Sequence, residues 1–188
     1  MIKEKPFGLY LFRKQSEKQI VLKELLQFLK TISPAQGNSF SYIGANNSLH
    51  PHLSLWENLQ LEIGKTSWKD FQLSLNPEQI TLVKLIKKPE KKVIESEVWE
   101  KFLVSLIKGL ISPSKNLLID MNEELISSLI IQNLKKNVLM AGHSKTVFLA
   151  SANTALWLDC AHSLVNRKDY QFIIESLNSE DIKKEWIA

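Results

Sequence analysis

Cysteine and long apolar runs are scarce in this sequence, and each absence excludes a class of protein. The single cysteine, Cys160, excludes an internal disulfide and a metal site made of cysteines alone. No apolar run approaches the roughly 18 residues that span a membrane. Residues 1–6 are charged and lack the apolar segment of a signal peptide. We therefore expect a cytoplasmic protein.

Several site motifs are also absent. The sequence has no glycine-rich dinucleotide loop, no Ser-His-Asp pattern and no zinc-type spacing. The four histidines are scattered, and only His50 and His52 lie close together. Neither a cysteine nor a second acidic cluster lies near them in sequence, so no metal site is predicted. There is no internal repeat and no low-complexity tract.

The composition is that of one globular domain. The chain has 188 residues, of which 44% are apolar, enough for a sizeable core. Its 24 basic and 20 acidic residues give a net charge of +4. This mild excess predicts an ordinary solvated surface, and it leaves contact with nucleic acid or an anionic membrane face as the alternative.

Hydrophobic spacing predicts alternating strands and helices. Buried strands are expected at 8–12, 40–43, 116–120, 146–151 and 162–166. Helices are expected at 18–30, 55–63, 66–71, 77–86, 96–110, 122–137, 153–160, 170–177 and 179–186. Ser54 and Asn76 are suitable N-caps for two of these helices. The order predicts an α/β fold with a mainly parallel sheet.

The stretch 42–59 is the most informative. A short strand is followed by a polar loop, and residues 51–59 then read Pro-His-Leu-Ser-Leu-Trp-Glu-Asn-Leu. This run resembles the segment around the Q-loop of ABC-transporter ATPase subunits, where Pro-His-Leu-Thr-Val-x-Glu-Asn-Leu ends the loop. The glutamine that names the loop is replaced by Ala45, which has no side-chain oxygen for a magnesium ion or a water molecule.

The resemblance implies a P-loop NTPase-like, ABC ATPase-like domain over residues 1–188. Its core lobe would comprise residues 1–54 and 113–188, and residues 55–112 would form a helical lobe. The family's N-terminal β-subdomain would be reduced, because only seven residues precede the first expected strand. The adenine-stacking aromatic of that subdomain would be lost with it.

The family's phosphate-binding loop is degenerate here. Placed without a gap, its three glycines fall at Phe12, Gln15 and Glu17. The lysine is retained as Lys18, and Gln19 replaces the magnesium-binding hydroxyl. The glycines allow backbone N–H groups to surround the phosphates, and Glu17 would place a negative charge beside them, which is repulsive by several kcal/mol at about 4 Å.

The remaining motifs are altered in the same way. The apolar strand ending at Asp120 resembles the second nucleotide motif, but Met121 replaces the catalytic glutamate and cannot activate a water molecule. Residues 96–100 replace the family's signature, and Ala152 replaces its histidine. Asp120 alone is equally explained as a cap of the helix expected at 122–137.

These replacements predict a pseudo-ATPase: no enzyme, no catalytic or metal residues, and no bound ATP or magnesium, with Lys18 and Asp120 as vestiges of the nucleotide site. The expected function is a structural or regulatory subunit. Its partner would be a permease-type membrane subunit, another ABC ATPase-like subunit or a second copy of the chain, and it would lie at the inner face of a membrane. A partner-docking groove is expected at Leu49, Pro51, Leu53, Leu55 and Trp56.

Three alternatives stay open. The first is a weakly active ABC ATP-binding subunit that uses Lys18 and Asp120. The second is a nucleic-acid-binding module that uses the basic excess, although no face carries basic residues interleaved with aromatics. The third is a self-assembling scaffold.

Overall fold

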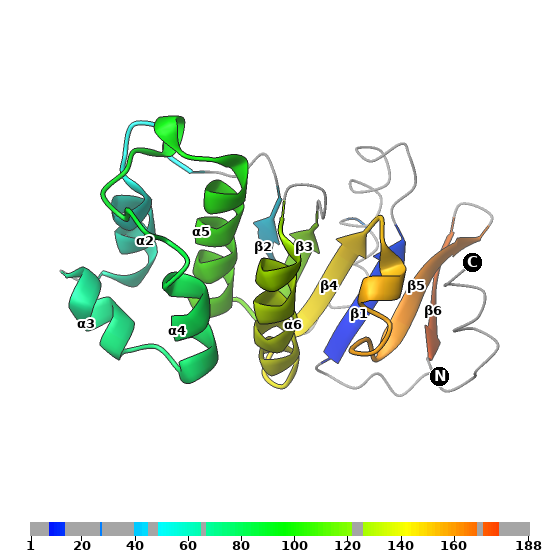
Figure 1. The fold of residues 1–188 in the computed structure, drawn as a ribbon. Helices are drawn as coiled ribbons and strands as arrows, with labels where there is room; N and C mark the ends of the chain where they lie inside the picture. The colour runs from blue at the N-terminus through cyan, green and yellow to red at the C-terminus, as the bar shows by residue number, and fades with distance from the viewer. Residues whose placement is uncertain are drawn as a thin grey trace.

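The computed structural model describes residues 8–13, 27, 40–44, 49–64, 67–121, 126–168 and 171–176. Their strands form a six-stranded sheet in the order β2-β3-β4-β1-β5-β6 (Figure 1). The strands are β1 (Gly8–Arg13), β2 (Phe40–Ile43), β3 (Asn116–Asp120), β4 (Thr146–Ser151), β5 (Ser163–Lys168) and β6 (Gln171–Ser176). The first five pair in parallel, and β6 pairs antiparallel with β5. The prediction of an α/β fold with a mainly parallel sheet is confirmed.

The sequence predicted β1, β2, β3 and β4 to within one residue at their ends. Strands covered on both faces read as nearly continuous apolar runs. In β3, for example, Leu117, Leu118 and Ile119 are all fully buried. Alternating apolar and polar residues would have indicated a sheet with one face exposed to water. The continuous apolar pattern instead indicates strands that are covered on both faces.

The helices are α2 (Leu55–Ile63), α3 (Trp68–Leu73), α4 (Pro77–Val83), α5 (Val98–Ile111) and α6 (Ser128–Gly142), with 3-10 turns η2 (Val93–Glu95) and η4 (Thr154–Leu156). Helices α2 to α5 lie together beyond the β2 edge of the sheet (Figure 1). Ser54 and Asn76 cap α2 and α4 through capping boxes, as predicted. Gly64 ends α2 with a left-handed φ of 62°. None of the described helices has the length and apolar character needed to cross a membrane.

Two predicted elements are wrong, and a third is displaced along the chain. The helix expected at 153–160 is the short η4 followed by turns, and the helix expected at 170–177 is replaced by β6. Strand β6 depends on pairing with β5, for example Val165 with Ile174, and local spacing does not report this contact. The helix expected from 122 begins at Ser128. The helices expected at 18–30, apart from residue 27, and at 179–186 lie outside the described residues.

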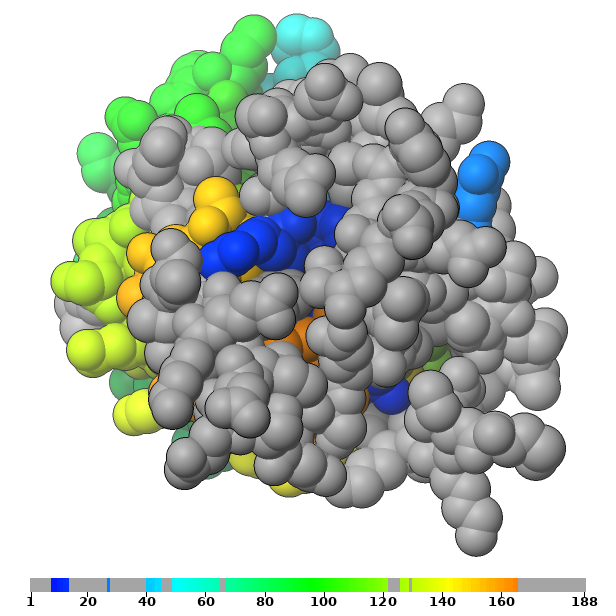
Figure 2. Space-filling view, turned by 90° about the vertical axis from the view of Figure 1, so that its right-hand side faces the viewer, coloured from blue at the N-terminus to red at the C-terminus, as the bar shows by residue number. Residues whose placement is uncertain are grey.

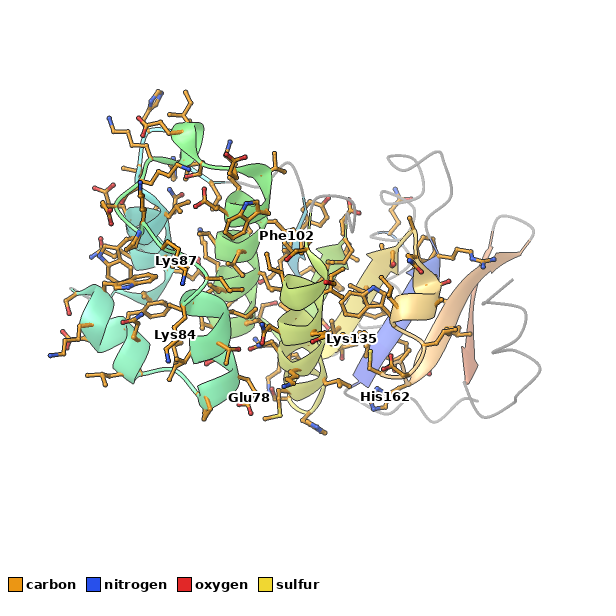
Figure 3. All side chains as sticks on the ribbon, viewed as in Figure 1. Glu78, Lys84, Lys87, Phe102, Lys135 and His162 are labelled. Atoms are coloured by element: carbon orange, nitrogen blue, oxygen red, sulfur yellow. The ribbon has the colours of Figure 1, made fainter. Side chains whose placement is uncertain are left out.

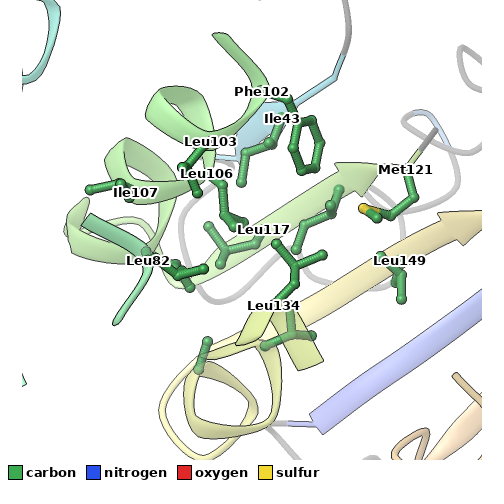
Figure 4. Close-up of a cluster of buried hydrophobic side chains, with 14 of the residues drawn as sticks. Ile43, Leu82, Phe102, Leu103, Leu106, Ile107, Leu117, Met121, Leu134 and Leu149 are labelled. Carbon is green, nitrogen blue, oxygen red and sulfur yellow. The ribbon is translucent and has the colours of Figure 1, made fainter. Parts of the chain in front are cut away.

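The core joins the sheet to helices α4, α5 and α6 (Figure 4). Gly109 of α5 is required for this packing, because a Cβ there would lie 2.5 Å from Cδ1 of the buried Ile43 in β2. Val98, expected to point inward, is 43% exposed because it is the first residue of α5. Asn137 of α6 donates to the carbonyl of Glu78 (2.9 Å), which links α6 to α4 (Figure 3 labels Glu78). Helix α5 packs on both the sheet and α2, and the division into two lobes stays a prediction.

Candidate functional site

The carboxyl ends of β1, β3 and β4 lie side by side, and Asp120 is at this edge of the sheet. Asp120 pairs in register with Ala150, and Ala150 pairs with Phe12 of β1. In Figure 2, blue atoms of β1 reach the surface beside gold atoms from the chain around the end of β4. In open α/β sheets, ligands bind outside the carboxyl ends of the strands. This edge is therefore the candidate site for a small-molecule ligand.

Asp120 is held from the neighbouring strand by Tyr42. The Tyr42 hydroxyl donates to Oδ2 of Asp120 at 3.1 Å. Burial, together with the charge of Asp120 and this hydrogen bond, raises the pKa of Tyr42 above its usual value. The ring folds over Gly44, where an added Cβ would overlap the Tyr42 hydroxyl and lie 2.7 Å from its Cζ. Residue 44 therefore has to be glycine for the tyrosine to adopt this position.

The sequence did not predict this contact, and the helix-capping alternative for Asp120 is wrong. Helix α6 begins at Ser128 and has Ser127 as its N-cap residue, seven positions after Asp120. The apolar stretch before Asp120 correctly indicated a strand end. Tyr42, the hydrogen-bond partner of Asp120, could have been inferred only from the parallel pairing of β2 with β3, in which Tyr42 lies beside Leu118.

The other positions of the nucleotide motifs are only partly described. Met121 is fully buried, and its N–H donates to the Ala150 carbonyl at 2.9 Å. Phe12, expected in the phosphate loop, is a buried residue of β1. Ala152 is exposed just after β4. Lys18 lies outside the described residues, as do Gln15, Glu17, Gln19 and Ala45.

The family's signature was expected at the start of α5. There, the side-chain carboxylate of Glu100, in the first turn of the same helix, bonds to the backbone. Oε2 of Glu100 accepts from the N–H of Glu97 at 2.9 Å and pairs with Nζ of Lys91 at 2.9 Å. Glu100 is 7% exposed, so this ion pair is largely shielded from water. The contact fixes the first turn of α5 against the segment before η2.

The segment 51–56 is bound along its backbone to residues 89–94. The N–H groups of Leu55 and Trp56 donate to the carbonyls of Lys91 and Pro89, at 2.9 and 2.8 Å. In the opposite direction, the N–H groups of residues 93 and 94 donate to the carbonyls of residues 53 and 51, at 3.0 and 2.9 Å. These bonds place η2 over the first turn of α2 (Figure 1).

Asn58 is the buried anchor of the preceding loop. Its side chain is 0% exposed. It accepts from the N–H of His50 (2.8 Å) and donates to the carbonyls of His50 (3.1 Å) and Ser54 (2.9 Å). The Glu-Asn-Leu end of the family pattern therefore has a structural role here: Glu57 completes the capping box, Asn58 holds the loop, and Leu59 is buried in the core.

The five residues of the expected docking groove differ in exposure. Leu55 is 0% exposed and belongs to the core. Trp56 is half-buried and packs against the rings of Trp68 and Phe71, at centroid distances of 5.3 and 5.5 Å. Leu49 and Leu53 are half-buried, and Pro51 is exposed. Ile94, which the sequence pattern did not indicate, is 59% exposed, and its N–H donates to the Pro51 carbonyl.

No group of three or more histidine, cysteine or acidic side chains in the described ranges could hold a metal ion. His50 and His52 are exposed. Nδ1 of His162 accepts from the N–H of Leu9 at 3.0 Å, so this histidine joins the start of β5 to β1 (Figure 3 labels His162).

No protein-family model matches the chain, and no curated protein matches it in sequence. Solved structures match it in fold. One is the ATP-binding subunit of an ABC transporter, with a TM-score of 0.70, 15% identity, and coverage of 96% of this chain and 82% of that one. Another is an ATP-binding cassette in a dimeric post-hydrolysis state bound to ADP and phosphate, with a TM-score of 0.66, 15% identity, and coverage of 94% and 88%. The chain therefore has the P-loop NTPase fold of ABC ATPase domains, as the resemblance implied.

This likeness corrects two expectations. The sequence analysis predicted that the chain is not an enzyme and that ATP and magnesium are not bound. Both predictions are contradicted, because the matching structures are an ATP-binding subunit and a cassette that holds ADP and phosphate. Both predictions rested on the side chains at the positions of the phosphate loop, whereas phosphates are bound largely by backbone N–H groups and helix N-termini.

Replacement of Asn58 is expected to destabilise the protein. Asn58→Ala would leave the N–H of His50 without its acceptor and would remove one of the two donors to each carbonyl of His50 and Ser54, at a cost of about 2 kcal/mol in the free energy of unfolding. Urea denaturation measures this cost. Leu61→Ala, at a position 59% exposed on the same helix, is the control and should change stability by less than about 0.5 kcal/mol. Equal effects of the two substitutions would contradict the anchoring role.

The tyrosine contact predicts a pH dependence. The pKa of Tyr42 is raised in the folded protein, so the unfolded chain loses this proton first, near pH 10. The contribution of the protonated Tyr42 hydroxyl to the free energy of unfolding is therefore complete below about pH 10, and it declines as the pH rises toward the pKa of Tyr42 in the folded protein. Unfolding free energies at pH 8 to 11 should fall more steeply for the wild type than for Tyr42→Phe. Parallel curves would show that the hydroxyl is not held in this way.

Proposed function

We propose that this chain is an ATP-binding subunit of ABC type, which binds Mg-ATP at the carboxyl ends of β1, β3 and β4. The observation that carries the proposal is the position of Asp120, an acid at the end of β3 in line with the ends of β4 and β1. The fold shared with ABC ATP-binding domains supports it.

Asp120 fits a magnesium ion. Magnesium prefers oxygen ligands and is commonly held by one or two carboxylates together with the phosphates of a nucleotide. Oδ2 of Asp120 already accepts a hydrogen bond from Tyr42, which orients the carboxylate. The ion would supply positive charge beside the phosphates.

ATP turnover is proposed to be slow. Met121 follows Asp120 at the strand end, and its thioether cannot accept a proton from an attacking water molecule. It is also fully buried, so it contributes packing at this position. The proposal is thus a nucleotide-binding subunit of low intrinsic activity.

The second part of the proposal is a partner. The docking surface, defined as Leu49, Pro51, Leu53, Trp56 and Ile94, is proposed to bind a short amphipathic helix of a permease-type membrane subunit at the cytoplasmic face. The backbone bonds between 51–56 and 89–94 support this by holding the surface rigid. A second copy of the chain, or another ABC ATPase-like subunit, would complete the assembly. One of the matching cassettes is itself a dimer.

Nucleotide binding is tested by calorimetry on the full chain, with the oligomeric state measured in the same sample. We expect Mg-ATP to bind with a Kd below about 1 mM. Asp120→Asn should weaken binding about tenfold in magnesium and little in EDTA. Asp159→Asn, at an exposed carboxylate paired with Lys135, is the control and should change neither value. If Mg-ATP at about 5 mM shows no measurable binding, the ATP-binding proposal is refuted.

Docking is tested by recovery of membrane proteins from solubilised membranes of the source cell. Ile94→Asp would place a charge in the proposed interface, and we expect it to reduce recovery of a permease-type subunit about tenfold. Leu73→Asp introduces the same charge on α3, at a position 76% exposed, and should leave recovery unchanged. If both variants recover as much as the wild type, the surface does not bind such a partner.

A further inference from the structure

The hydrogen bond between Tyr42 and Asp120 joins the edge strand β2 to the end of β3 at the candidate nucleotide site. The Tyr42 hydroxyl donates to Oδ2 of Asp120 at 3.1 Å, and the bond lies at the surface of the protein. Tyr42 is 39% exposed, so only part of its ring is used in packing. The contact therefore acts on the carboxylate that we propose as a magnesium ligand.

The two carboxylate oxygens of Asp120 have different surroundings. Oδ1 is buried and has essentially no surface in contact with water. Oδ2 takes part in the surface bond to Tyr42, and the residue as a whole is half-buried. A metal ion that arrives from solvent can therefore reach Oδ2 and not Oδ1.

The hydrogen bond leaves a single position for a metal at Oδ2. A carboxylate oxygen offers two lone pairs. The phenol of a tyrosine is protonated at neutral pH, so the Tyr42 hydroxyl is the donor and uses one of them. In this arrangement Asp120 has one lone pair of one oxygen available for an ion.

The same bond restrains the rotation of the carboxylate. The last torsion of an aspartate side chain is broad and only weakly fixed by its own geometry. Loss of the Tyr42 bond would allow the group to turn and to present both oxygens to an ion. The restraint requires glycine at position 44, because an added Cβ there would overlap the Tyr42 hydroxyl.

Magnesium and calcium differ in what they require of a carboxylate. Magnesium needs nearly ideal octahedral geometry, keeps several waters, and is usually bound through one or two carboxylates together with the phosphates of a nucleotide. Calcium takes roughly six to eight oxygen ligands in flexible geometry and can bind both oxygens of one carboxylate. An acid that offers a single oxygen therefore suits magnesium better than calcium.

We propose that Tyr42 makes the nucleotide site selective for magnesium over calcium, by holding Asp120 so that it offers one oxygen to the ion. Tyr42 acts through Asp120 and is therefore a positioning residue. This inference rests on the proposed function, because it requires that Asp120 meets the metal ion of the bound nucleotide.

The experiment is calorimetry of ATP binding to the full chain, once with magnesium and once with calcium as the only divalent ion. The quantity compared is the ratio of the calcium Kd to the magnesium Kd. We expect a ratio of about ten or more for the wild type, and about three or less for Tyr42→Phe, which removes only the hydroxyl. A hydroxyl that merely stabilises the fold would change both Kd values alike and leave the ratio unchanged.

A second variant tests the same point with the hydroxyl retained. The methyl group of Gly44→Ala would displace the Tyr42 ring, so the ratio should fall in this variant too. Tyr10→Phe is the matched control, because it removes the hydroxyl of a tyrosine that is 8% exposed in β1 and stacks on Phe148. It should leave the ratio unchanged. Thermal unfolding without nucleotide shows whether each variant is folded.

Three outcomes would overturn the proposal, and they can be told apart. If the wild type does not bind Mg-ATP, the ATP-binding proposal fails and this inference fails with it. If the wild type binds ATP equally well with the two ions, only the inference fails. If the preference for magnesium persists in both Tyr42→Phe and Gly44→Ala, another part of the site selects the ion.

Discussion

Burial of the parallel sheet on both faces is the constraint on which the rest of the structure depends. Strand β3 lies between β2 and β4, and its three central residues are fully excluded from water. A strand in this position cannot carry a charged side chain in its middle without a large desolvation cost. Polar chemistry is therefore confined to the strand ends and the sheet edge. Asp120 occupies the carboxyl end of β3, and Ser41 of the edge strand β2 donates to Ser112 at the end of α5.

The same constraint explains the construction of the loop after β2. Among the described residues, helices α2 to α5 and the turn η2 lie between β2 and β3, so this long connection has to be fixed by its own polar contacts. Asn58 supplies them from inside α2, and backbone bonds to residues 89–94 supply the rest. In the stretch that resembles the family most closely, Ser54, Glu57 and Asn58 therefore hold the fold through their side chains.

The sequence predicted the local features well and the distant ones poorly. Capping residues such as Ser54 and continuous apolar runs such as 117–119 act over a few residues, so helices and buried strands could be placed accurately. Strand β6 and the contact of Tyr42 with Asp120 depend on residues that are remote along the chain. The prediction that no nucleotide is bound, which the matching structures contradict, rested on side-chain replacements, whereas phosphates are bound largely by backbone groups.

The central claim is that nucleotide binds at the carboxyl ends of β1, β3 and β4. Hydrogen–deuterium exchange of the full chain, with and without Mg-ATP, tests the location directly. We expect slower exchange in peptides that contain residues 12–13, 120–121 and 150–151, with no change in α3. Unchanged exchange at all three strand ends in saturating nucleotide, or protection confined to other parts of the chain, would contradict it.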